Sequence, residues 1–156
     1  MAIFRGLGII TVSHAIMTTT TQLSPTPASR PLQVIHADDM PELRALVRIL
    51  FQRAGHTVAC YANGRLALEH LAADPARVDL LITDHHMPGM NGLELVRQAR
   101  ALAYGGKIIV FSSELSREVA AHYRALQVDR ILDKPIFPSD IRRMLGELFP
   151  PVGVVR

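Results

Sequence analysis

The sequence predicts an α/β protein with a doubly wound parallel β-sheet of five strands and five helices. Strand-like and helix-like segments alternate five times between residues 32 and 149. The strand-like segments are short and apolar almost throughout, which is typical of strands that are buried on both faces. Five strands that are each followed by a helix favour a parallel sheet with helices on both sides.

The composition is that of one globular domain. The chain has 156 residues, of which 49% are hydrophobic, so it contains enough apolar material for a core. The single cysteine, Cys60, excludes an internal disulfide and lies in an apolar stretch, so we interpret it as a buried small side chain. The net charge of +3 is mild and scattered, which gives no indication of direct nucleic-acid binding. No apolar run reaches the roughly 18 residues that span a bilayer, so we expect a cytoplasmic protein without membrane contact.

Both ends of the chain are expected to lie outside the folded domain. Residues 1–31 are predicted to be a flexible N-terminal extension, because their second half is rich in Thr, Ser and Pro. Their first half resembles a weak signal peptide without a clear cleavage site, so an extension or translation from Met17 is favoured over export. The folded domain is predicted over residues 32–149, and residues 150–156 form a short tail.

Two strand–helix units make up the first half of the domain. The first contains a strand over 32–37 and a helix over about 40–54, which Gly55 ends as a C-terminal cap. The apolar residues of this helix recur at helical spacing: Leu43, Leu46, Val47 and Leu50. The second unit contains a strand over 57–61 and a helix over 64–73.

The third and fourth strands are predicted over 79–84 and 107–111. Between them, Asn91 and Glu94 have the spacing of a capping box and open a helix that continues to about Ala103.

The last helices flank the fifth strand. A helix is predicted over about 115–126, the strand over 129–133, and a final helix from Pro138, a residue suited to a first turn, to Leu148. The first of these helices carries three apolar residues on one face: Val119, Tyr123 and Leu126.

Polar and charged side chains stand at the ends of four of the predicted strands. They are Asp38, Asp39, Asp84, Ser112, Ser113 and Lys134. The carboxyl ends of parallel strands share one edge of the sheet, where ligands of such proteins bind. Three carboxylates held close together repel one another and need a cation, and Mg²⁺ prefers oxygen ligands. A carboxylate can also attack phosphorus to form an aspartyl-phosphate, which a metal ion, an ammonium and a hydroxyl would stabilise.

Each of these side chains also has a purely structural interpretation. Asp39 has the position of an N-cap, with Glu42 three residues later. Asp84 can cap the loop that follows it, Ser112 or Ser113 can cap the helix after the fourth strand, and Lys134 can be a solvated lysine. We favour the functional interpretation, because unrelated caps and loop residues are not expected to gather at one edge of a sheet.

Four segments resemble the receiver domain of bacterial two-component response regulators, in that family's order: HADDMPELR, LLITDHHMPGMNGLEL, IIVFSS and LDKPI. The resemblance covers residues 32–149. It implies a flavodoxin-like fold with strand order 2-1-3-4-5, like that of the stand-alone chemotaxis receiver.

The resemblance also implies a role for each residue at the sheet edge. Asp84 is identified as the phosphoryl acceptor, Ser112 as a contact of the phosphoryl group, and Lys134 as its ionic partner. The groups implied to hold Mg²⁺ are Asp38, Asp39, Asp84 and the backbone carbonyl of His86. The peptide bond between Lys134 and Pro135 is expected to be cis, as it usually is in this family.

Four positions either depart from the family pattern or lie where they are expected to affect the phosphoryl group. Ile131 stands where the family often has a Phe or Tyr whose rotation follows phosphorylation, and an Ile cannot make that movement. His85 and His86 suggest a two-histidine metal site, but adjacent side chains on extended backbone diverge, so we expect His86 to border the phosphoryl group and affect its lifetime. Glu114 is expected to do the same.

The function implied by the resemblance is a phosphorylation-dependent signalling switch. The phosphoryl donor is a sensor histidine kinase or a histidine phosphotransfer protein, and the domain catalyses only its own phosphotransfer and dephosphorylation, so it is not an enzyme for an external substrate. Few residues follow the predicted domain, so we expect a stand-alone receiver. We expect it to be a monomer or weak dimer. Its output is expected to be contact with a downstream protein or onward phosphorelay.

Two other functions remain open at the level of sequence. One is a degenerate receiver that acts only as a protein-binding module, although such receivers usually lack the acceptor or the lysine. The other is a phosphohydrolase, but those enzymes place an Asp-x-Asp nucleophile after the first strand, where this chain has the adjacent pair Asp38 and Asp39.

Overall fold

The computed structural model describes residues 30–151 of the chain. Most of the predicted N-terminal extension, 1–31, and of the C-terminal tail, 150–156, therefore lies outside the described residues. The described part contains these elements in order: β1 (Gln33–Ala37), α1 (Pro41–Arg53), β2 (Thr57–Tyr61), α2 (Gly64–Ala73), the 3₁₀ helix η1 (Pro75–Arg77), β3 (Leu80–Asp84), α3 (Gly92–Ala101), β4 (Lys107–Ser112), α4 (Arg117–Ala125), β5 (Arg130–Asp133) and α5 (Pro138–Leu148).

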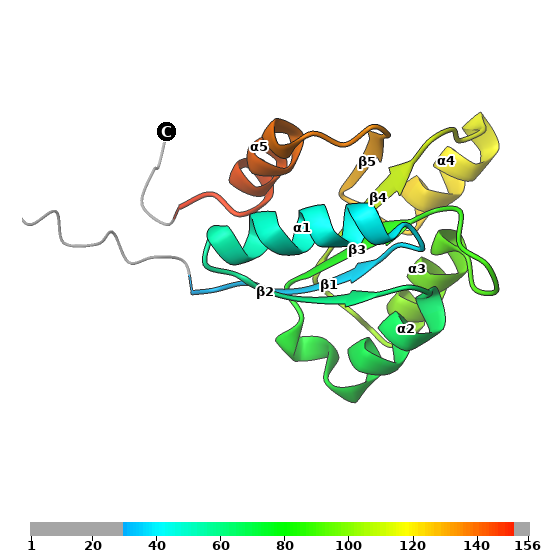
Figure 1. Cartoon of the computed structure of the whole chain (residues 1–156). Coiled ribbons are helices and arrows are strands. Elements are labelled where there is room, and N and C mark those ends of the chain that lie inside the picture. The colour runs from blue at the N-terminus through cyan, green and yellow to red at the C-terminus, as the bar shows by residue number, and fades with distance from the viewer. Residues whose placement is uncertain (1–29, 152–156) are drawn as a thin grey trace, which may run out of the picture.

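The five strands form one parallel sheet in the order β2-β1-β3-β4-β5. Figure 1 shows α1 and α5 on one face of this sheet and α2 and α3 on the other. The predicted fold class, with its strand order and its five helices, is confirmed. The short helix η1 is an addition that the sequence did not predict.

The sheet is buried because a separate apolar cluster covers each face. One cluster joins α2, α3 and α4 to the sheet and contains Leu81 of β3, whereas the other joins α1 and α5 to it and contains Leu80 and Ile82. All five residues of β3 are buried, as expected for a central strand whose successive side chains point to opposite faces. This burial explains why the strand is a continuous apolar run until its last two residues.

The helix termini follow several of the local signals in the sequence. The Asn91 side chain accepts a hydrogen bond from the Glu94 N–H at 2.9 Å, which confirms the predicted start of α3. Gly55 follows α1 with φ +84°, a left-handed conformation that costs glycine little. Pro138 occupies the first turn of α5, as predicted.

Two structural interpretations of the edge residues are wrong. The N-cap of α1 is Met40, without a side-chain hydrogen bond, so Asp39 does not cap that helix. The cap of α4 is Ser116, which accepts from the Val119 N–H at 3.1 Å, so neither Ser112 nor Ser113 caps it. Both findings leave the polar residues at the sheet edge without a role in capping these helices.

Across residues 30–151, none of the helices combines the length and the apolar character needed to cross a membrane.

Candidate functional site

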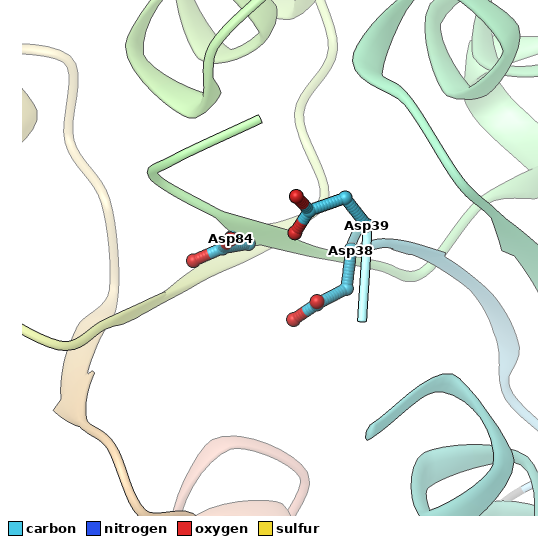
Figure 2. A group of neighbouring side chains, drawn as sticks. All are labelled: Asp38, Asp39 and Asp84. Carbon is cyan, nitrogen blue, oxygen red and sulfur yellow. The ribbon is translucent and has the colours of Figure 1, made fainter. Parts of the chain in front are cut away.

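The predicted acidic residues meet at the carboxyl edge of the sheet. Asp38 and Asp39 follow β1 directly, and Asp84 is the last residue of the neighbouring strand β3. Each offers a carboxylate oxygen, and these three oxygens lie within 4.8 Å of one another. Figure 2 shows the three side chains extending from the strand ends toward a common space. Asp38 and Asp84 are buried, whereas Asp39 is exposed to solvent.

Lys134 reaches this acidic cluster from the end of β5. Its Nζ lies 3.2 Å from Oδ1 of Asp84 and 3.3 Å from Oδ2 of Asp38. One ammonium against three carboxylates leaves a balance of two negative charges when all four groups are ionised (three minus one). The peptide bond between Lys134 and Pro135 is cis, as the resemblance implied.

The negative charge of Asp38 is disfavoured by its surroundings. Burial raises the pKa of its carboxyl group, and the neighbouring Asp84 adds to the rise. The Met40 N–H, which donates to Asp38 at 2.8 Å, and the Lys134 ammonium lower the pKa but do not cancel the effect of burial. A bound cation would favour the charged carboxylate, so the residues present fit a divalent metal ion with a preference for oxygen ligands.

Ser112 lies at the same edge but makes a local contact. It is the last residue of β4 and is fully buried, and its hydroxyl donates to the backbone carbonyl of Glu114 at 3.2 Å. The structure thus brings Asp38, Asp39, Asp84 and Lys134 together, while the Ser112 hydroxyl is engaged with its own loop.

His36 is a buried residue of the site that the sequence did not single out. Within the described part of the chain, neither of its ring nitrogens has a hydrogen-bond partner, and its Nε2 lies 3.9 Å from Oδ2 of Asp38. Burial, and then the positive charge of Lys134, lower the pKa of His36 to about 3, so the ring is neutral. Its edge packs against the ring of Phe111. The only signal in the sequence was a histidine inside an apolar strand.

The expectation that the side chains of His85 and His86 diverge is wrong. Their rings pack edge to face with centroids 4.6 Å apart, because the chain turns directly after β3 rather than continuing as a strand. In the described residues, the group suited to a metal ion is the acidic cluster and contains neither histidine. Instead, Nδ1 of His85 is hydrogen-bonded to the hydroxyl of Tyr123 at 2.6 Å.

Comparison with known proteins agrees with this geometry. A family model described as the response regulator receiver domain matches residues 34–146. The two-component response regulator ORR11 of Oryza sativa subsp. indica is 30% identical over 122 residues, which are 77% of this chain and 82% of that protein. The sensory/regulatory protein RpfC of Xanthomonas campestris pv. campestris (strain 8004) is 28% identical over 123 residues, and the match spans only 17% of its length.

Solved structures give the same result. The chemotaxis response regulator CheY4 of Vibrio cholerae superposes with a TM-score of 0.68 at 30% sequence identity, and the match covers 76% of this chain and 99% of that chain. A CheY-like receiver domain protein of Methanospirillum hungatei superposes with a TM-score of 0.71 at 22% identity, which supports the fold alone.

Proposed function

This chain belongs to the response regulator receiver domain family, and we propose that it is a phosphorylation-dependent signalling switch that accepts a phosphoryl group on Asp84 with the help of Mg²⁺. The observation that carries the proposal is the meeting of three carboxylates within 4.8 Å, two of which also contact one lysine. An uncompensated acidic cluster beside an ammonium suits a metal ion and a phosphoryl group better than it suits a structural ion pair.

Receiver domains generally bind Mg²⁺ in an acidic pocket, and this chain offers the ligands for it. Asp38, Asp39 and Asp84 would hold the ion, together with the backbone carbonyl of His86. When bound, Mg²⁺ balances the carboxylates and the negative oxygens of the incoming phosphoryl group.

The remaining roles follow from chemistry at Asp84. A carboxylate oxygen of Asp84 attacks the phosphorus of a phosphohistidine, a P–O bond forms, and the P–N bond breaks with its electron pair staying on the donor histidine. Lys134 is already paired with Asp84 and would bind a phosphoryl oxygen. Rotation of the Ser112 hydroxyl away from the Glu114 carbonyl would let it donate to the same group. His86 and Glu114 are proposed to border this position and to affect the lifetime of the acyl phosphate.

The partners are proposed on the same basis. The donor is a sensor histidine kinase or a histidine phosphotransfer protein, and the response is a changed contact with a downstream protein or onward phosphotransfer. Relatives of this chain include response regulators and the sensor histidine kinase AruS of Pseudomonas aeruginosa, which supports this class of partner. The domain itself catalyses only its own phosphorylation and dephosphorylation.

Incubation with acetyl phosphate and Mg²⁺, followed by intact-mass measurement, tests the proposal. We expect the mass of one added phosphate in the native protein and none in the Asp84→Asn variant. Asp79→Asn is a suitable control, because Asp79 precedes the same strand at its other end and contacts Arg30 instead of the cluster. No phosphate gain with any small-molecule donor or phosphohistidine donor would favour a pure binding module. Steady turnover of a generic phosphate ester would favour a phosphohydrolase.

A further inference from the structure

Helix α4 packs on the domain mainly through one buried side chain, with the partly buried Val119 against the same apolar cluster. All residues of this helix are described, and among them only Tyr123 is buried, at 0% exposure. Its ring lies in the apolar cluster that also contains Leu95 and Val96 of α3. Since most of the helix surface is exposed, the position of α4 depends strongly on what Tyr123 contacts.

The polar end of Tyr123 contacts the residue that follows Asp84. Its hydroxyl forms a hydrogen bond of 2.6 Å with Nδ1 of His85, and the two rings pack edge to face with centroids 5.6 Å apart. Which partner donates depends on the imidazole tautomer. The hydroxyl itself stays protonated, because burial, and then the negative charge of Asp84, raise the pKa of Tyr123 well above its usual value.

The His85 ring is attached to a fixed stretch of backbone. The His85 N–H donates to the Phe111 carbonyl at 3.0 Å, and its own carbonyl accepts from the Gly92 N–H at 2.9 Å. A side chain on Gly92 would collide with the Asp84 carbonyl oxygen and also with the Tyr123 hydroxyl. The end of β3, the start of α3 and the Tyr123 hydroxyl are therefore packed closely enough at Gly92 to leave no room for one more carbon atom, so movement of one of them requires movement of the others.

From these contacts we propose that Tyr123 is a positioning residue that couples the phosphorylation state of Asp84 to helix α4 through the ring of His85. The inference rests on the proposed function of Asp84. Ile131 of β5 packs against the same apolar cluster, and its side chain cannot form a hydrogen bond. It therefore cannot replace Tyr123 in this coupling. Phosphorylation adds about one further negative charge and strong acceptor oxygens next to His85, and the changed loop moves or releases Tyr123 and with it α4.

Hydrogen exchange of α4 tests the coupling in the full chain. Exchange of residues 117–125 is measured by mass spectrometry with Mg²⁺ alone and with Mg²⁺ plus beryllium fluoride, a stable mimic of the phosphoryl group. We expect the mimic to change the exchange rate of α4 by about fivefold or more in the native protein, the lower end of typical coupling between sites. In Tyr123→Phe, which lacks only the hydroxyl, we expect this change to fall below about twofold.

A matched control separates the coupling from loss of a buried hydroxyl in general. Tyr104 is also buried in this cluster, and its hydroxyl donates to the Lys107 carbonyl at 3.3 Å, near the opposite edge of the sheet. Tyr104→Phe is expected to keep the full response of α4. A second variant, His85→Leu, removes the other partner while Tyr123 stays in the core, and it should lose the response as Tyr123→Phe does.

Intact mass after acetyl phosphate treatment distinguishes failure of the proposed function from failure of the coupling alone. If the native protein gains no phosphate, the proposed function and the inference fall together. If it gains phosphate and α4 does not respond, or responds equally in Tyr123→Phe or His85→Leu, only the inference is overturned. Retained phosphorylation of Tyr123→Phe with a lost α4 response supports it.

Discussion

The acidic residues at the two edges of the sheet differ in the partners that they contact. At the amino edge, Asp79 accepts hydrogen bonds from the Arg30 guanidinium, at 2.6 and 2.9 Å, and from the Gln33 N–H, at 2.8 Å. Asp129 at the same edge accepts from the Ile108 N–H at 2.9 Å and from Lys107 at 3.2 Å. At the carboxyl edge, three carboxylates lie close together, and Lys134 is the lysine that contacts two of them, Asp38 and Asp84, among the described residues.

The pKa values follow this difference. Burial raises the pKa of Asp79, but the hydrogen bonds from Arg30 and Gln33 outweigh it and hold the pKa below its usual value. Burial raises the pKa of Asp38, and there the opposing partners are too few to outweigh it. The acids of the amino edge are paired with basic groups and N–H donors of the protein, whereas those of the carboxyl edge fit the cation proposed above.

The largest difference between the two edges is expected in the rate of Asp84 phosphorylation when the lysine at each edge is replaced. Lys134→Met should slow phosphorylation of Asp84 by about 100-fold, the usual cost of removing one group that stabilises developing charge. Lys107→Met removes the matching ion pair with Asp129 and should leave the rate unchanged. The rates are measured by intact mass over time with acetyl phosphate. Equal rates in both variants would mean that Lys134 is only a structural partner.

Neutralising one acid at each edge should shift stability in opposite directions. In metal-free buffer, Asp79→Asn is expected to lower the free energy of unfolding by about 1–2 kcal/mol, since charge-assisted hydrogen bonds are lost. Asp38→Asn is expected to raise it, since a costly buried charge is removed. Addition of Mg²⁺ at 100 times its Kd should stabilise Asp79→Asn by about 2.7 kcal/mol, as it does the native protein, and Asp38→Asn much less.

The same two variants, Asp79→Asn and Asp38→Asn, also allow a test by the pH dependence of stability. The folded-state pKa of Asp79 is lowered, so its stabilisation is complete above the unfolded-state pKa and is lost as pH falls through the folded-state value. The folded-state pKa of Asp38 is raised, so the folded state binds that proton more readily and stability falls as pH rises through this range. Urea titrations at several acidic pH values measure the free energy of unfolding. It should rise less steeply with pH in Asp79→Asn than in the native protein, and more steeply in Asp38→Asn.

The smallest change in the free energy of unfolding is expected when His36 or His56 is replaced, two histidines that differ in hydrogen bonding. His36 is buried without a partner among the described residues, so His36→Leu should raise the free energy of unfolding by about 1 kcal/mol. His56 accepts a hydrogen bond from the Leu32 N–H at 3.2 Å, so His56→Leu should lower it by about 1 kcal/mol. Urea unfolding measures both. Loss of stability in His36→Leu would contradict the view that the ring is an unpaired polar group.

The fold and the acidic cluster were predictable because both depend on short stretches of sequence. Each apolar run was long enough for one strand, and each strand was followed by a helix, so a parallel sheet placed Asp38, Asp39 and Asp84 at one edge whatever the details of packing. The helix termini at Asn91 and Gly55 were set by contacts within a few residues, and these too were predicted correctly.

Contacts between residues that are far apart in the chain, or that depend on the surrounding fold, were decided by the tertiary structure alone. Tyr123 and His85 are 38 residues apart, and helical periodicity placed Tyr123 on the apolar face of its helix without indicating what its hydroxyl contacts. The edge-to-face packing of His85 on His86 depends on a turn whose dihedral angles no local pattern specified. The isolation of His36 likewise results from side chains that other strands and helices bring around it, because hydrogen-bond partners of a buried group come from the whole fold rather than from its own segment.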